Sequence, residues 1–213
     1  MSKAQNPIEA FGKAAKVYQE KFMDVSAYHI SLNFFVDQLK LNSNILELAC
    51  GPGNLTSYLS NSNKNLNILA TDASAEMVEL AKQNNPTVNF QILDIKNLSE
   101  LRSQFDGIVA GFILNYLTKQ EVINFLSAAK KMLLKNGLIY ISFMEAEEIN
   151  SGIKSSSTGE YHLYINYFSK QNIETILTDL NFEIIYSEEI PSQRLPSKND
   201  LVLIANQKDL TFQ

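Results

Sequence analysis

The sequence is poor in the residues on which disulfides and metal sites depend. Its 213 residues include one cysteine, Cys50, two histidines, His29 and His162, and no tryptophan. A single cysteine cannot form an internal disulfide, and no spacing of His, Cys, Asp and Glu resembles a metal site, so we expect no metal. Both features are typical of a protein of the reducing cytoplasm.

Long runs of apolar residues and long runs of basic residues are also missing. No apolar window reaches the length of a transmembrane helix, and residues 1–20 scatter lysines among alanines instead of forming a signal-peptide core. Long basic runs are absent, and the net charge is −5, which disfavours nucleic acid as a partner. We therefore expect a soluble cytoplasmic protein that does not bind membranes. Whether it is a monomer or a homodimer is left open.

What the chain does have is enough apolar material for a core, arranged in alternation. Hydrophobic residues make up 45% of the sequence. Short apolar runs alternate with patterns of helical period, which predicts a parallel sheet with helices on both faces. The expected strands of this part are 45–49, 66–71, 88–93, 106–110 and 138–144. Two further strands, 182–190 and 201–206, have no helix between them and should form an antiparallel hairpin.

The rest of the chain surrounds this alternating part. We predict a single domain over residues 1–213, in which residues 1–43 form an N-terminal helical cap with helices near 8–18 and 26–40. The sheet core covers residues 44–145. Residues 146–168 are expected to form a lid or insertion, polar at first and then aromatic, with an additional strand at 161–168. Residues 169–213 supply a last helix and the hairpin.

A candidate ligand site follows the first strand. The run 45–49 ends in a loop that contains Gly51 and Gly53, and a helical pattern begins at Asn54. Strand, glycine turn and helix N-terminus is the arrangement by which open α/β sheets hold a ligand outside the carboxyl ends of their strands.

Three acidic residues, Glu47, Asp72 and Asp94, lie at or near the ends of the first three strands. In a parallel sheet these ends share one edge. Asp72 follows the glycine loop by about twenty residues, the spacing at which a carboxylate reaches the hydroxyls of a ribose. The sequence thus predicts a nucleoside site.

Three details disfavour a dinucleotide. Thr56 stands where the third glycine of a dinucleotide-binding loop would be, Glu47 would repel a pyrophosphate, and no basic residue follows before Lys64. A ligand that lacks phosphate and carries positive charge fits this site better.

The same stretches resemble the class I S-adenosylmethionine (SAM)-dependent methyltransferases. The resemblance covers about residues 40–207, and its most specific part is the glycine motif at 47–53. The matching segments occur in the family's order: 47–53 (ELACGPG), 71–74 (TDAS) with Met77, 93–95 (LDI), 105–111 (FDGIVAG) and 134–140 (LKNGLIY). The resemblance implies a Rossmann-like, doubly wound, mostly parallel sheet of seven strands that ends in an antiparallel hairpin.

The resemblance also implies that the cofactor is SAM, which becomes S-adenosylhomocysteine (SAH). Asp72 would accept hydrogen bonds from the ribose hydroxyls, and Asp94 would bind the adenine amino group. Glu47 and the carbonyl of Ala110 would face the ammonium group, and Tyr18 would cover the tail. The residues implied in cofactor binding are Tyr18, Glu47, Ala49, Cys50, Gly51, Gly53, Asp72, Ala73, Met77, Asp94, Ile95 and Ala110.

The expected reaction is an in-line displacement that transfers the methyl group of SAM to a small-molecule acceptor. Positioning and exclusion of water can supply most of the catalysis, so no catalytic side chain is assigned. Candidates for contact with the acceptor are Asn115, Tyr116, Glu145 and His162, each of which also fits a structural role. Two alternatives remain open: methylation of RNA or protein, and a SAM-binding regulatory module without transfer.

Overall fold

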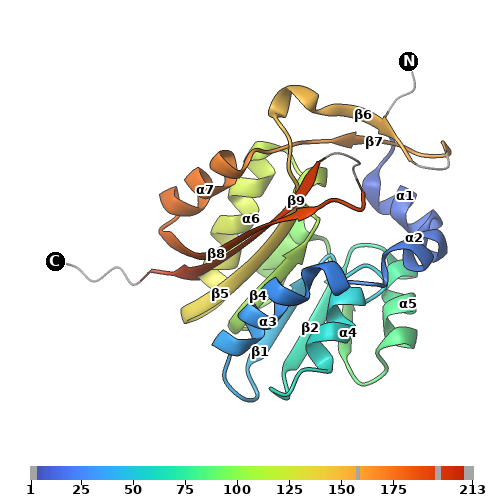
Figure 1. Cartoon of the computed structure of the whole chain (residues 1–213). Helices are drawn as coiled ribbons and strands as arrows, with labels where there is room; N and C mark the ends of the chain where they lie inside the picture. The colour runs from blue at the N-terminus through green and yellow to red at the C-terminus, as the bar shows by residue number, and fades with distance from the viewer. Residues whose placement is uncertain (1–3, 157–158, 195–197, 209–213) are drawn as a thin grey trace.

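The protein is built around one seven-stranded sheet, shown in a computed structural model in Figure 1. The structure describes residues 4–156, 159–194 and 198–208. The strand order is β3-β2-β1-β4-β5-β9-β8, and only β9 runs antiparallel to its neighbours. The strands are β1 (Asn44–Leu48), β2 (Asn67–Asp72), β3 (Asn89–Ile92), β4 (Phe105–Gly111), β5 (Leu133–Met144), β8 (Phe182–Pro191) and β9 (Asn199–Gln207).

Helices cover both faces of this sheet because residues along each strand alternate between two cores. Ile45 of β1 packs with the helices of one face, whereas Leu46 and Leu48 pack with those of the other. The first face carries α3 (His29–Gln38), α4 (Asn54–Ser60) and α5 (Ala75–Asn84), with η1 (Ser26–Tyr28) before α3. The second face carries η2 (Ile95–Glu100), α6 (Lys119–Met132) and α7 (Lys170–Asp179).

The strand order reverses beside β1, and this reversal positions the candidate site. β2 and β4 pair with opposite edges of β1, so that Leu48 lies level with both Thr71 and Ala110. The helical connections after β1 and β4 leave in opposite directions from this point. Open α/β sheets bind their ligands in the crevice at such a switch point.

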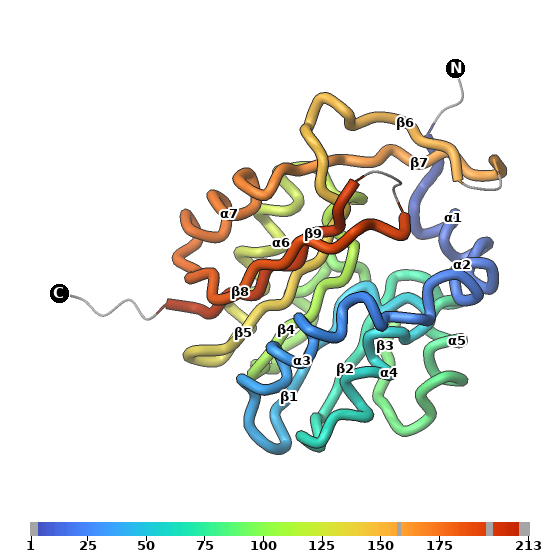
Figure 2. The backbone as a smooth tube through the Cα atoms, viewed as in Figure 1, coloured from blue at the N-terminus to red at the C-terminus, as the bar shows by residue number. Residues whose placement is uncertain are grey.

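Elements from two distant parts of the chain lie over the carboxyl ends of the strands (Figure 2). One is the helix pair α1 (Pro7–Lys13) and α2 (Ala15–Phe22); the other is a separate two-stranded sheet of β6 (Gly152–Ser155) and β7 (His162–Ile165). Gln5 joins them, because its backbone N–H donates to the His162 carbonyl at 2.8 Å and its side chain accepts from the His162 N–H at 2.8 Å. The short helices η3 (Leu114–Tyr116) and η4 (Glu148–Asn150) lie in the loops after β4 and β5.

Three expectations about the elements need correction. The helix expected at 8–18 is broken, because Ala14 (φ −89°, ψ 4°) ends α1 and precedes α2. β5 begins at Leu133, five residues before the expected start, and Asn136 in it has φ +61°. The strand expected at 161–168 is the shorter β7, which pairs with β6 inside the segment expected to be a loop.

The described residues include no helix that is long and apolar enough to span a bilayer. Within the same residues, no group of three or more His, Cys, Asp and Glu side chains is arranged to hold a metal ion.

Candidate functional site

A cavity of about 470 Å³ lies at the carboxyl ends of β1, β2 and β4. We call it the first cavity. Its walls come from the loop after β1, the start of α5, the turn after β3 and the N-terminal helices. Sequence-predicted residues that line it are Tyr18, Ala49, Gly51, Asp72, Ala73, Met77, Asp94, Ile95 and Tyr116.

The two glycines of the loop after β1 serve different purposes. Gly51 has φ +55° and lines the first cavity, and an added Cβ there would approach only Tyr18, at 3.7 Å. Gly53 has φ +85° and does not line the first cavity; its added Cβ would lie 2.5 Å from the Asn85 amide and 3.3 Å from Ala81. Gly53 thus allows α4 to pack closely against α5.

Asp72, at the end of β2, fixes the shape of the glycine loop. One carboxylate oxygen accepts from the Gly51 N–H at 2.9 Å, and the other accepts from the Ser74 N–H at 2.8 Å. Burial raises the pKa of the Asp72 carboxyl, while these N–H groups act in the opposite direction. Each oxygen has a second acceptor site, so a ligand diol in the first cavity finds a carboxylate already held in place.

The other predicted nucleoside residues lie on the same wall. Asp94 begins η2, where its side chain accepts from the Lys96 N–H at 2.9 Å. Ile95 follows it, and Met77 of α5 is buried with its side chain lining the first cavity. The structure therefore brings together two carboxylates, Asp72 and Asp94, and the apolar surface of Met77 on one wall of the first cavity, which we call the nucleoside wall.

Glu47 differs from the other acidic residues because it lies below the loop, 1% exposed. Its Oε2 accepts from the Thr56 hydroxyl at 2.6 Å, and its Oε1 has no hydrogen-bond partner among the described residues. Burial raises the pKa of this carboxyl to about 8. Glu47 lines a small pocket of about 20 Å³, which it shares with Ala49, Gly51 and Arg194.

Besides Glu47 and Gly53, two further residues predicted to bind the cofactor do not line the first cavity. Cys50 is buried and lines only the small pocket; burial raises the pKa of its thiol well above the usual value, so it behaves as a small apolar residue. Ala110 is fully buried between β1 and β5 and lines neither the first cavity nor the small pocket, whereas its neighbour Gly111 lines both.

A second cavity, of about 890 Å³, adjoins the first. It lies between α1, α2, the end of β5 and the β6–β7 sheet. Four residues, which we call the boundary residues, line both cavities: Phe11, Tyr18, Tyr116 and Arg194. The Phe11 ring contacts the edges of its two tyrosine neighbours, with centroids 5.7 Å from Tyr18 and 4.9 Å from Tyr116.

The four candidates for acceptor contact are not equivalent. Tyr116 is a boundary residue. Asn115 is fully buried and bonds only to backbone, donating to the Met144 and Asn166 carbonyls and accepting from the Met144 N–H. Glu145 accepts from the Lys170 N–H at the start of α7, and His162 Nδ1 lies 3.0 Å from a serine hydroxyl. Of these four residues, Tyr116 lines the first and second cavities, and the other three line neither.

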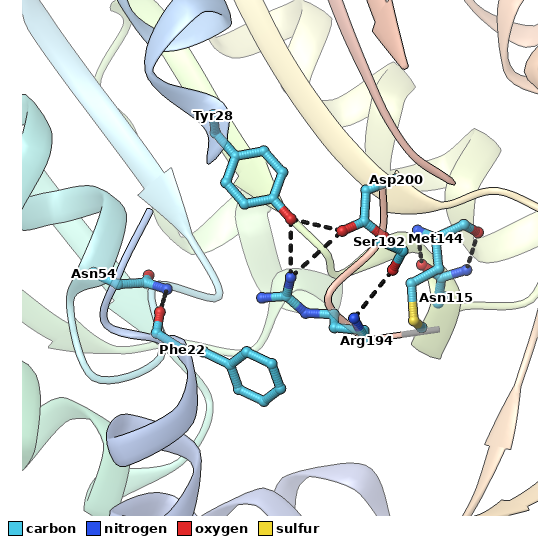
Figure 3. Close-up of polar contacts among 8 residues, drawn as sticks. All are labelled: Phe22, Tyr28, Asn54, Asn115, Met144, Ser192, Arg194 and Asp200. Carbon is cyan, nitrogen blue, oxygen red and sulfur yellow. Dashed lines mark hydrogen bonds and ion pairs between the residues drawn. The ribbon is translucent and has the colours of Figure 1, made fainter. Parts of the chain in front are cut away.

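Sequence reasoning missed Arg194, which extends from the connection between β8 and β9. Figure 3 shows its guanidinium beside Tyr28 and Asp200; Nη1 donates to the Tyr28 hydroxyl at 3.2 Å and lies 3.7 Å from the Asp200 carboxylate. Its plane covers the ring of Phe112 at 3.6 Å and that of Phe22 at 4.5 Å. No spacing in the sequence connects Arg194 with the glycine loop, so only the fold could identify it.

Comparison with known proteins agrees with the geometry of this site. Residues 45–137 match the family model described as a methyltransferase domain. The chain is 28% identical over 184 residues to malonyl-[acyl-carrier protein] O-methyltransferase 1 of Ilyobacter polytropus, which covers 84% of this chain and 67% of that protein. It is 26% identical over 162 residues to a putative methyltransferase of Invertebrate iridescent virus 6 (73% of this chain, 58% of that protein). With a second relative, from Anoxybacillus flavithermus, the match spans 62% of the relative's length.

Solved structures show the same fold. The 1,6-didemethyltoxoflavin-N1-methyltransferase of Burkholderia thailandensis, solved with its substrate and SAH, superimposes with a TM-score of 0.74 at 17% identity, over 98% of this chain and 93% of that one. A SAM-dependent methyltransferase of Clostridium acetobutylicum gives a TM-score of 0.71 at 17% identity, over 94% and 100% of the two chains.

A seven-stranded sheet with one antiparallel strand and a carboxylate-lined cavity at its switch point defines a Rossmann-like α/β protein with a nucleoside site. Over residues 45–137 the chain resembles the methyltransferase-domain family. Its fold is that of solved class I SAM-dependent methyltransferases.

Proposed function

We propose that this protein transfers the methyl group of SAM to a small-molecule acceptor. The observation that carries the proposal is the pair of adjoining cavities with four boundary residues between them. A cofactor in the first cavity and an acceptor in the second would meet at this boundary. Volumes of about 470 and 890 Å³ are in the range of small-molecule sites.

The residues of the first cavity fit SAM. Asp72 would accept from the two ribose hydroxyls, and Asp94 with Ile95 would bind the adenine edge while Met77 packs on its face. The buried Glu47 supports the tail assignment, because its Oε1 has no partner among the described residues and an ammonium group would supply both charge and hydrogen bond. Tyr18 would cover the tail from α2.

In the proposed reaction, the main task of this chain is to position the acceptor and SAM relative to each other. A nucleophilic atom of the acceptor attacks the methyl carbon as the bond from that carbon to sulfur breaks, and the sulfur keeps the electron pair and becomes neutral. The boundary residues would align the acceptor with the methyl group, and the roof of α1, α2, β6 and β7 would exclude water.

A small acceptor is favoured by the second cavity, which the chain itself encloses from several sides. The similarity in fold to the 1,6-didemethyltoxoflavin-N1-methyltransferase supports the same interpretation. The similarity to a malonyl-[acyl-carrier protein] O-methyltransferase leaves open that a carrier protein presents the acceptor.

Calorimetry with SAM, SAH and NAD tests the cofactor assignment. SAM and SAH should bind and NAD should not. Asp72→Ala removes a charged acceptor from two hydroxyls and should cost about 2–4 kcal/mol, a loss of roughly 30- to 1000-fold in affinity. Asp37→Asn, on the exposed face of α3, is the matched control and should bind SAH like the parent protein. Equal affinity of the Asp72→Ala variant would show that Asp72 does not bind the ribose.

Transfer itself is tested by incubating the protein and methyl-labelled SAM with a deproteinised metabolite extract. Label should appear in a small molecule, and the Asp72→Ala variant should produce much less of it. Binding of SAM without labelled product, or label only in added protein or RNA, would contradict the proposed function.

A further inference from the structure

The second cavity has an apolar interior. Its walls are aliphatic and aromatic side chains from three parts of the fold, which suits an acceptor with a hydrocarbon chain or ring. Representative members are Phe11, Val17, Phe22, Met144, Leu163 and Ile165.

The charged residues around this cavity are mostly cations, although the whole chain has a net charge of −5. Five cations line it, against the single carboxylate of Glu160. Lys21 and Glu160 each have interactions of their own, and Asp200 balances the charge of Arg194. The other three lysines, Lys13, Lys154 and Lys198, form no ion pair within the described part of the chain. A cavity mouth with this excess of positive charge attracts anions and repels cations.

The boundary offers donors and no base. Of the boundary residues, Phe11 is apolar, Tyr18 and Tyr116 are phenols, and Arg194 is a cation. Burial raises the pKa of Tyr116 above its ordinary value, so its hydroxyl stays protonated and acts as a donor. The carboxylates of the first cavity are the ones we assign to ribose and adenine. A nucleophile that must first lose a proton would therefore find no carboxylate or imidazole among the four boundary residues to accept it.

Arg194 is placed to hold an anion at the boundary. Its Nη1 is turned toward Tyr28 and Asp200, while in Figure 3 the second terminal nitrogen points away from both. Contacts with Phe22 and Phe112 fix the plane of the guanidinium. A guanidinium held in this way presents donors whose geometry matches a carboxylate.

On the basis of the proposed function, we infer that the acceptor is an organic acid with an apolar body and that its carboxylate is methylated to an ester. One carboxylate oxygen would be held by Arg194 and Tyr116, and the other would attack the methyl carbon. The new bond joins oxygen and carbon, the bond from carbon to sulfur breaks, and sulfur keeps the electron pair. A carboxylate is already ionised near pH 7, so no proton has to be removed.

The first test compares the binding of octanoate, octanol and octylamine to the SAH-saturated protein by calorimetry. Octanoate should bind at least about tenfold more tightly than the other two, and added salt should weaken its binding. Octanol or octylamine binding as tightly as octanoate, or no binding of octanoate to protein that has bound SAH, would overturn the inference. If SAH itself fails to bind, the proposed function fails instead.

The second test examines the labelled product formed from the metabolite extract. A methyl ester releases its label as volatile methanol in mild alkali, whereas methyl groups on nitrogen, carbon or an ether oxygen remain attached. Alkali-labile label supports the inference, and alkali-stable label overturns it.

Variants separate Arg194 from the cofactor site. Arg194→Met should weaken octanoate binding by about tenfold or more, and by a clearly larger factor than it weakens SAH binding. Lys154→Met should have a smaller effect in the same direction, and Lys119→Met, at the exposed start of α6, should have none. If Arg194→Met does not fold because Asp200 loses its partner, Arg194→Met combined with Asp200→Asn keeps the pair neutral. Loss of SAH binding with octanoate binding retained would assign Arg194 to the cofactor and overturn this part of the inference.

Discussion

Glu47 and Thr56 show how one side chain can prepare a site for a cation. The Glu47 carboxylate is withdrawn from water and receives one hydrogen bond, from the Thr56 hydroxyl at 2.6 Å, while its second oxygen has no partner among the described residues. Such an arrangement disfavours the charged form, as the raised pKa of about 8 reflects. A bound ammonium group would reverse this preference. In the sequence, Thr56 only marks a missing glycine; in the structure, it orients Glu47.

The raised pKa of Glu47 predicts a pH dependence of stability in the ligand-free protein. The unfolded chain releases this proton near pH 4.5, whereas the folded protein keeps it up to about pH 8. The contribution to stability is therefore complete below pH 4.5 and is lost as the pH rises toward 8, with a slope of up to about 1.4 kcal/mol per pH unit. Glu47→Gln removes this slope.

Urea unfolding between about pH 6 and pH 7.5 measures the effect. Over this interval Glu47→Gln should gain stability relative to the parent protein by about 1–2 kcal/mol. Glu20→Gln, on the exposed side of α2, is the control and should follow the parent profile. Parallel profiles for the parent and Glu47→Gln would contradict the prediction.

Binding of SAM should also release a proton from Glu47. With a pKa of about 8 the carboxyl is mostly protonated near neutral pH, and a bound ammonium would ionise it. Calorimetry near pH 7 in two buffers of different ionisation enthalpy should report release of nearly one proton. Glu47→Gln should release none; an equal release from both proteins would assign the proton to another group.

At the scale of elements, the docking of α1 against α5 connects the N-terminal helices to the nucleoside wall. A Cβ on Gly12 would lie 2.7 Å from an oxygen of Glu76 and 3.1 Å from the Ser74 hydroxyl. Gly12→Leu should therefore push α1 away from α5 and displace Phe11 at the boundary. We expect SAH affinity to fall about tenfold, which corresponds to about 1.4 kcal/mol, with the sheet core intact.

Calorimetry with SAH and the circular dichroism spectrum of the Gly12→Leu variant test this together. Lys16→Leu, on the exposed side of α2, is the control for an added leucine and should bind SAH normally. Unchanged affinity of the Gly12→Leu variant would show that the position of α1 does not matter for the cofactor.

The elements also show which parts of the fold the sequence could predict. The alternation of apolar runs and helical patterns placed β1, β2, β4, α4 and the final hairpin, because each buries its own periodic face. Local patterns could not show that helix 8–18 breaks at Ala14, or that β6 pairs with β7, since those depend on contacts with the rest of the molecule. The same limit applies to the residues of the candidate site. The sequence could predict that Asp72 and Asp94 lie close together because both follow strand ends, whereas the fold alone brings Arg194 to the first cavity.

At the scale of the whole molecule, different parts of the chain form the two cavities. The sheet, with the loops after β1, β2 and β3, supplies the nucleoside wall. The second cavity is formed largely by α1, α2, β6, β7 and the β8–β9 connection, segments that lie outside residues 45–137. Under the proposed function, the acceptor would therefore contact mainly the parts of this chain that the family model does not cover.

Because both α1–α2 and the sheet contribute to the first cavity, SAH should stabilise the whole molecule. A ligand that binds only the folded state at about 100 times its dissociation constant adds about 2.7 kcal/mol to the free energy of unfolding. For a chain of 213 residues this corresponds to a rise of about 5–10 °C in melting temperature. Thermal unfolding followed by circular dichroism with SAH, and with NAD as the control, measures it. The rise should appear with SAH and not with NAD, and in the Asp72→Ala variant at the same ligand concentration it should fall to about a third of its size or less. A shift of full size in this variant would place SAH binding away from Asp72 and the glycine loop.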